Sequence, residues 1–192
     1  MTQMRERRLI SLGFRVHSGW AVMIAFDGNE VVERRRIELA ADGMPVQPYH
    51  VAEALGFTEA ETLIARCEEI TRRLAMAALE RLDVNGVRAA CVLASSGRPL
   101  PDLASVLASH ALIHTAEGAM YRDAILHAAM RLGIPLVAAK EKEVFAHLPA
   151  ETRRRIERYG KILGPPWRQD EKLATAAAYV AHIADLSRAT ET

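Results

Sequence analysis

The sequence predicts an α/β protein with one mixed, five-stranded sheet and helices on both of its faces. Two observations carry this prediction. Three short apolar runs separated by turn residues come first, and two further apolar runs follow, each reached through a helical segment. The first three runs are expected to form an antiparallel meander, whereas strands joined through a helix are expected to be parallel, with a right-handed crossover.

Composition and charge narrow the class of protein. Half of the 192 residues are hydrophobic, 26% are charged and the formal net charge is +1, so we expect a single globular domain over residues 1–192. This charge excludes a whole-molecule attraction to nucleic acid or an anionic membrane but leaves room for a local basic patch. Cys67 and Cys91 are too few for a disulfide framework, and no apolar run approaches about 20 residues. A cytoplasmic protein without a membrane span is therefore expected.

The first 39 residues hold the expected meander. Its strands are placed at residues 8–14, 20–26 and 30–39. The turn Asp27-Gly28-Asn29 favours a tight hairpin, because Gly and Asn tolerate a positive φ. Three consecutive arginines at 34–36 are typical of an edge strand protected against unwanted pairing, with an anion site as the alternative.

The remainder is expected to alternate helices with two buried strands. Residues 40–56 read as a loop, and Thr58 with Glu61 predicts a capping box that starts a helix ending near Leu82. Strands are expected at residues 87–94 and 134–139, and helical segments from 102 with a break at 110–115, then at 117–132, 143–147, 150–162 and 169–186. Cys67 and Cys91 both read as core thiols.

Two short motifs resemble a known family. Ser18-Gly19-Trp20-Ala21-Val22 resembles the second half of the first hairpin of RuvC-type Holliday-junction resolvases, and the segment from Gln169 to Ala176 resembles their last helix. The resemblance implies the ribonuclease H-like fold. It also implies a nuclease site in which clustered acids hold two divalent cations.

The acids that this chemistry needs are mostly missing. The first is expected on strand one, where this chain has Leu12 or Gly13, and residues 8–16 contain no acid. At the end of the fourth strand the chain has Ala94 and Ser95. Only the last helix keeps a candidate, Asp170, with Glu171 beside it. The sequence therefore favours a protein without two-metal nuclease activity, because hard cations need several oxygen ligands.

Polar residues still gather where ligands bind in such sheets, beyond the carboxyl ends of the strands. The candidate ligand-binding residues are Arg15, His17, Ser18, Ser95, Ser96, Arg98, Lys140 and Arg168. Asp170, at the start of the last helix, is expected to join them at this rim. Hydroxyls, backbone N–H groups and guanidinium forks suit a phosphate or carboxylate. The alternative is a set of turn residues and solvated charges.

A second polar cluster surrounds Glu117. With His114 and Tyr121 it has the groups for acid–base work, or it caps a helix at Thr115 and pins that helix to a neighbour. Glu117 is also the candidate to join Asp170 as a catalytic carboxylate. No metal-ligand spacing is assigned to His110, His127, His147 or His182.

Three functions remain open. The first is a binding module for nucleic acid, a phosphate-bearing ligand or a protein, without a cofactor. The second is a nuclease or phosphoesterase that uses Asp170 and Glu117 with Mg²⁺ or Mn²⁺. The third is a homodimer that buries a sheet edge or the small-residue helix face formed by Ala174, Ala177, Ala178 and Ala181. Trp20 is expected in the core and His127 in a packed or interfacial position. Trp167 is expected to pack against the last helix or to stack on a base. The arginines at 153–155 are expected to form a solvated helix face or to contact phosphates. Whether the chain is an enzyme stays open.

Overall fold

The sheet has five strands in the order β3-β2-β1-β4-β5. The computed structural model describes residues 9–83, 86–94, 99–146 and 148–190. The strands are β1 (Ile10–His17), β2 (Trp20–Phe26), β3 (Val31–Glu38), β4 (Val87–Ala94) and β5 (Leu136–Lys140). β1 pairs antiparallel with β2 and parallel with β4, so the meander and the crossovers meet at β1. The predicted mixed sheet is confirmed.

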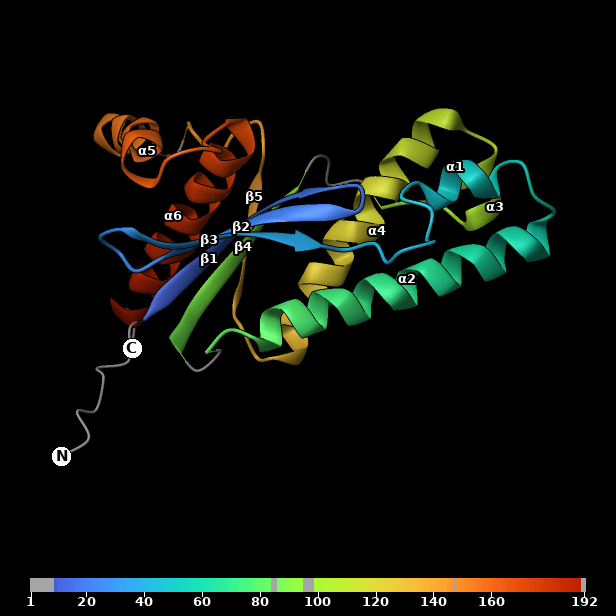
Figure 1. Ribbon diagram of the computed structural model, residues 1–192, viewed down its shortest axis with the longest axis horizontal. Coiled ribbons are helices and arrows are strands. Elements are labelled where there is room, and N and C mark those ends of the chain that lie inside the picture. The colour runs from blue at the N-terminus through green and yellow to red at the C-terminus, as the bar shows by residue number, and fades with distance from the viewer. Residues whose placement is uncertain (1–8, 84–85, 95–98, 147, 191–192) are drawn as a thin grey trace.

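Helices cover both faces of the sheet (Figure 1). They are α1 (Pro48–Ala52), α2 (Phe57–Glu80), α3 (Leu103–Leu107), α4 (His110–Arg131), α5 (Ala150–Leu163) and α6 (Gln169–Thr190). α2 and α4 lie on one face, and α6 lies on the other with α5 outside it (Figure 1). The far ends of α2 and α4, with α1 and α3, extend beyond the sheet as a helical lobe (Figure 1).

Strand alternation divides the core into two layers. On β1, Leu12, Phe14 and Val16 face the layer under α2 and α4. On β2, Val22, Ile24 and Phe26 face the layer under α6. Because successive side chains point to opposite faces of a strand, Gly13, Arg15 and His17 must lie on the α6 side of β1.

Gly13 allows α6 to approach the sheet at backbone distance. A Cβ at this position would overlap the carbonyl oxygen of Ala174 and the backbone nitrogen of Ala178. The alanine face of α6 is therefore buried against its own sheet, with Ala174, Ala177 and Ala178 fully inaccessible. The expectation that this face serves a homodimer is wrong, because the chain itself covers it.

Several local expectations are also corrected. α2 begins at Phe57 behind Gly56 with no side-chain cap, so the Thr58–Glu61 capping box is absent. The loop at 40–56 contains the short helix α1. β5 is a partly exposed edge strand, unlike the buried strand expected. Residues 143–146 form turns, and His147 lies outside the described residues.

The most consequential correction concerns α4. Its helix is continuous from His110, and the break expected at 110–115 falls earlier, at Ala108 and Ser109. Thr115 lies inside the helix and its hydroxyl donates to the carbonyl of Ala111, so it is not a cap.

None of the described helices has the length and apolarity needed to cross a membrane.

Candidate ligand-binding site at the rim of the sheet

The end of β1 meets the start of α6. The close approach at Gly13 fixes α6 over β1, and the first turn of α6 then carries Asp170 to the Arg15 and His17 end of the strand. His17 Nε2 lies 2.8 Å from Asp170 Oδ1, and Arg15 Nε lies 3.9 Å from the same oxygen. The sequence placed these three residues at one rim, and the structure brings them together.

Two carboxylates at this rim, Asp170 and Glu141, lie beside cationic side chains, whereas Glu171 accepts a hydrogen bond from the backbone N–H of Arg168. Besides Asp170, Arg15 Nε lies 3.2 Å from Glu141 Oε2, at the end of β5. β1 itself carries no acid along Ile10–His17. Among the described residues, no three carboxylates gather closely enough to share one ion. The rim therefore contains ion pairs and hydrogen bonds where a cluster of metal-binding carboxylates would be needed.

An aromatic ladder extends this cluster across the sheet. His17 pairs with Trp20 across the β1–β2 hairpin, and their rings stack at 4.3 Å with an interplanar angle of 14°. From β3, the guanidinium of Arg36 lies 3.9 Å from the indole centroid. Since β2 lies between β1 and β3, these two partners approach Trp20 from opposite sides. Trp20, read from the sequence as core, is half-buried in this ladder.

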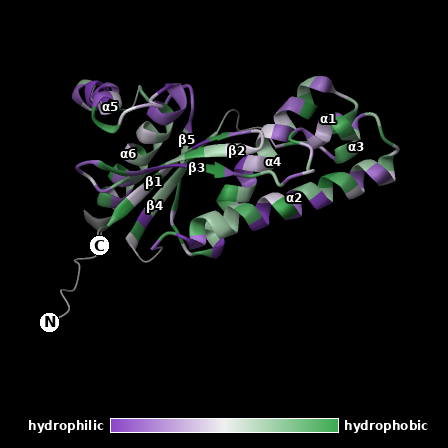
Figure 2. Cartoon of the chain, viewed as in Figure 1, coloured by the Kyte–Doolittle hydropathy of each residue, from purple (hydrophilic) through white to green (hydrophobic). Residues whose placement is uncertain are grey.

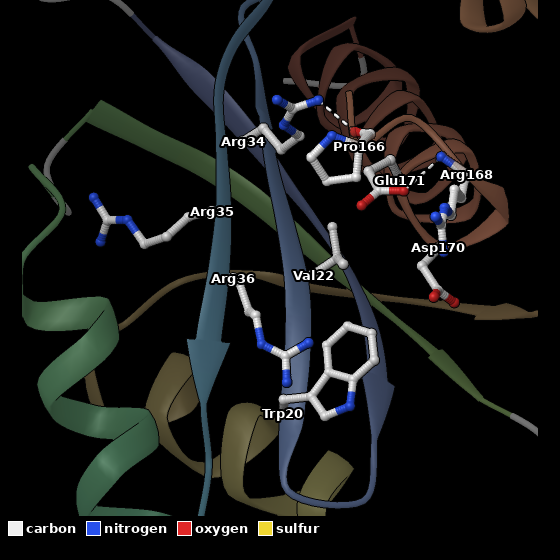
Figure 3. A pocket seen from close by; sticks show the side chains of 9 residues that line it. All are labelled: Trp20, Val22, Arg34, Arg35, Arg36, Pro166, Arg168, Asp170 and Glu171. Carbon is white, nitrogen blue, oxygen red and sulfur yellow. Dashed lines mark hydrogen bonds between the residues drawn. The ribbon is translucent and has the colours of Figure 1, made fainter. Parts of the chain in front are cut away.

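A pocket of about 500 Å³, which we call the rim pocket, opens beside the ladder of His17, Trp20 and Arg36. Its lining side chains come from β2, β3, the segment that leads into α6 and the first turn of α6 (Figure 3). They are Trp20, Val22, Arg34, Arg35, Arg36, Pro166, Arg168, Asp170 and Glu171. This volume lies within the range of small-molecule sites, about 300–1,000 Å³.

The arginines around the pocket have different tasks. Arg34 Nη1 donates to the carbonyls of Gly164 at 2.9 Å and Pro166 at 2.5 Å, so it holds the turn before α6 (Figure 3). Arg35 pairs with Glu33 and points away from the other lining side chains (Figure 3). Within the described part of the chain, the guanidinium of Arg168 has no hydrogen-bond or ion-pair partner, although its backbone N–H donates to Glu171.

Two residues of the rim were missed by sequence reasoning. Glu141 directly follows β5, so its place after a strand end could have identified it. Arg122 on α4 fills the space above Gly118, where a Cβ would lie 2.8 Å from its Nη1. Burial lowers the pKa of Arg122, the Asp123 charge raises it, and the Arg15 charge lowers it further. The rim thus holds a second, partly desolvated guanidinium.

The remaining predicted rim residues are scattered. Lys140 pairs with Glu143 at 3.1 Å, and Ser18 lines a separate pocket beside His50. Ser95, Ser96 and Arg98 lie outside the described residues. Lys140 and Ser18 therefore add nothing to the pocket at Trp20.

Glu117 has partners of its own. It is 2% exposed and accepts hydrogen bonds from the backbone N–H groups of Tyr49 at 2.8 Å and His50 at 3.2 Å. Burial raises the pKa of the Glu117 carboxyl, while the hydrogen bonds from His50 and Tyr49 lower it. Glu117 thus joins α4 to α1, whereas Asp170 is bonded to β1. The helix-pinning alternative for Glu117 agrees with these contacts.

The remaining aromatic and basic candidates, Trp167, Arg155 and His127, lie outside the site. Trp167 donates its indole N–H to the carbonyl of Ile156 at 2.8 Å and packs on α5, where the sequence favoured the last helix. α5 is largely hydrophilic (Figure 2), and its Arg155 contacts the carbonyl of Asn29. His127, expected to be packed or at an interface, is exposed on α4.

Comparison with known proteins supports the fold. No protein-family model matches the chain, and no curated protein matches it. Among solved structures, Thermus thermophilus RuvC in complex with Holliday junction substrate superposes with a TM-score of 0.56 at 15% identity, covering 95% of this chain and 96% of that chain. A second Thermus thermophilus RuvC structure gives 0.49 at 16% identity, covering 95% and 97%.

The chain therefore has the ribonuclease H-like fold. Its five-stranded mixed sheet with helices on both faces matches the fold of the RuvC structure. The resemblance read from the hairpin and the last helix is confirmed at the level of fold.

Proposed function

We propose that this protein binds nucleic acid at the rim pocket through its phosphates and does not cleave it by two-metal chemistry. The observation that carries the proposal is the pairing of Asp170 with His17 and Arg15, at the end of a strand without acids. A carboxylate already matched with a cation is a poor ligand for Mg²⁺, which needs several free oxygens.

The charge of the pocket supports a phosphate ligand. Arg168 and Arg36 both present guanidinium groups there, and only Arg36 is engaged, with Glu38 at 2.5 Å. Guanidinium groups bind phosphate oxygens by charge-assisted, often bidentate hydrogen bonds. The fold adds support, because the RuvC structure with which the chain superposes was solved with a Holliday junction substrate.

The test is a binding titration of fluorescently labelled four-way DNA junction, duplex and single strand, repeated across salt concentrations. Each phosphate contact contributes about 0.9 to the slope of log K against log salt. Arg168→Ala is expected to weaken binding and to reduce that slope by about one. Arg131→Ala, an exposed arginine at the far end of α4, is the matched control and should match the wild-type protein.

Two results would overturn the proposal. One is the absence of binding to any of the three DNA forms. The other is an equal loss in Arg168→Ala and Arg131→Ala, which would place the contact elsewhere.

The alternative is a metal-dependent nuclease or phosphoesterase that uses Asp170 and Glu117. The same DNA substrates incubated with Mg²⁺ or Mn²⁺ distinguish it. Cleavage by the wild-type protein that disappears in Asp170→Asn and Glu117→Gln would favour the enzyme over the binding module.

A further inference from the structure

Three histidines meet in the helical lobe, and none of them lines the pocket at Trp20. His110 and His114 lie one turn apart on α4, and His50 comes from α1. One nitrogen from each ring lies within 4.8 Å of the others. Among the described residues, this is the one group of three or more His, Cys, Asp or Glu side chains with such spacing. Spacing along the chain gave His110 no metal-ligand partner among His127, His147 and His182, and its neighbours in the structure are instead His50 and His114.

The nitrogens of His110 and His114 are close to the spacing of two ligands on one ion. Their Nε2 atoms lie 3.1 Å apart. Two imidazoles bound tetrahedrally at about 2.05 Å from Zn²⁺ would place their nitrogens about 3.3 Å apart. Without an ion, this spacing requires that one ring donate a proton to the other. The first turn of α4 is thus already arranged as a two-ligand clamp.

The third histidine is oriented by a buried carboxylate. His50 Nδ1 lies 3.2 Å from Glu117 Oε1, so a neutral His50 donates there and keeps Nε2 as its acceptor. Metal-bound histidines generally donate their second ring N–H to a carboxylate or carbonyl in this way. Glu117 is further fixed by the α1 backbone, and its other oxygen is buried without a hydrogen-bond partner.

The cluster remains accessible on one side. His110 and His114 are exposed, and the side chain of His50 is 22% exposed. His50 also lines a pocket of about 450 Å³ that includes Ser18 and Gln47. Three protein ligands with an open fourth position, where water or a substrate oxygen can bind, are typical of catalytic zinc sites.

We propose that His50, His110 and His114 form a three-histidine site for Zn²⁺ or a similar transition-metal ion, with Glu117 as its positioning carboxylate. Neutral imidazole ligands suit Zn²⁺, Cu²⁺ and Ni²⁺, whereas Mg²⁺ prefers oxygen. The site is independent of the nucleic-acid proposal, because it shares no residue with the rim pocket.

The experiment is a calorimetric titration of the whole metal-free chain with Zn²⁺ alone. We expect one equivalent to bind the wild-type protein and the double variant His110→Ala/His114→Ala to lose that binding. Both residues are exposed, so this variant should keep its fold, which circular dichroism checks. Glu117→Gln should bind about 10–100-fold more weakly. Replacing Zn²⁺ with Co²⁺ should give the visible absorption of a tetrahedral nitrogen site.

The matched control is His127→Ala, an exposed histidine on the same helix. It should bind Zn²⁺ like the wild-type protein. Equal Zn²⁺ binding in the wild-type protein and the double variant, or an equal loss in His127→Ala, would overturn the site. Unchanged affinity in a folded Glu117→Gln would overturn the positioning role of the carboxylate.

Discussion

The rim pocket and the histidine cluster differ in how their ionisable side chains are arranged. At the rim, Asp170 lies beside His17 and Arg15, and Glu141 lies beside Arg15. In the lobe, three imidazoles face one another, and the nearby carboxylate of Glu117 lies behind them on His50. The rim therefore suits an anion that can compete for its guanidinium groups, and the lobe suits a transition-metal cation.

The comparison shows that the place where a fold usually carries a site does not decide the chemistry of the residues found there. The end of β1 at the start of α6 is where the ribonuclease H-like resemblance places a metal. The metal site that we propose lies instead between α1 and α4. Four experiments test whether the rim and the lobe differ in this way, and the first should have the greatest consequence for stability.

Gly13→Ala should be the most damaging change, since it separates β1 from α6 and so dismantles the rim. The added Cβ meets backbone atoms of Ala174 and Ala178, which cannot rotate away. We expect a loss of about 3 kcal/mol or more in the free energy of unfolding, measured by urea titration. Gly56→Ala, where the new Cβ meets nothing nearer than 4.0 Å, should cost less than about 1 kcal/mol. Equal costs would contradict the backbone contact.

Metal ions should stabilise the lobe and not the rim. At a free Zn²⁺ concentration 100 times its dissociation constant, the wild-type chain should gain about 2.7 kcal/mol, seen as a rise in melting temperature that a chelator reverses. Mg²⁺ at the same concentration should give no rise, because the rim acids are paired. A Mg²⁺-dependent rise that Asp170→Asn removes would show that the contrast is wrong.

Asp170→Asn should strengthen DNA binding at the rim. The change removes a negative charge beside Arg15 and His17 and frees both for phosphates. One charge at about 4 Å is worth about 1 kcal/mol in water, so the affinity for labelled DNA should rise about fivefold. Glu80→Gln, an exposed carboxylate at the end of α2, should leave it unchanged. Weaker binding in Asp170→Asn would indicate that Asp170 holds the ligand.

The smallest effect is expected when thiol reagents are added to the folded protein, because Cys67 and Cys91 are each buried in one of the two core layers. Burial raises the pKa of Cys91 to about 12 and also raises that of Cys67. At pH 8 only about one Cys91 in 10⁴ is then a thiolate, so thiol reagents should react only after unfolding. Alkylating reagents should accordingly leave Zn²⁺ binding intact. Rapid labelling of the folded protein would contradict this burial.

The sequence was most informative where a single periodicity governed a segment. β2 and β4 lie at the predicted residues, because apolar runs bounded by turn residues leave few alternatives. The Asp170, His17 and Arg15 cluster was also predictable, since strand ends and the start of α6 share one edge of the sheet. Asp102 was placed correctly at a helix start, where it accepts from Ser105.

The histidine cluster could not be found in the same way. His50 lies in a segment whose glycine and prolines read as a loop, and its partners are more than 50 residues away. His110 and His114 have the four-residue spacing of a helix face, but a break predicted between 110 and 115 concealed it. Long-range placement of α1 against α4 depends on the buried Glu117, and no local pattern contains that information.

Gly13 has a consequence for the history of this chain. If an ancestor carried an acid on the α6 side of β1 at that position, α6 now occupies the space that its side chain would need. A single codon change back to aspartate would collide with α6 before it could attract an ion. Reversal would demand a coordinated shift of a whole helix, so such a loss would be effectively one-way.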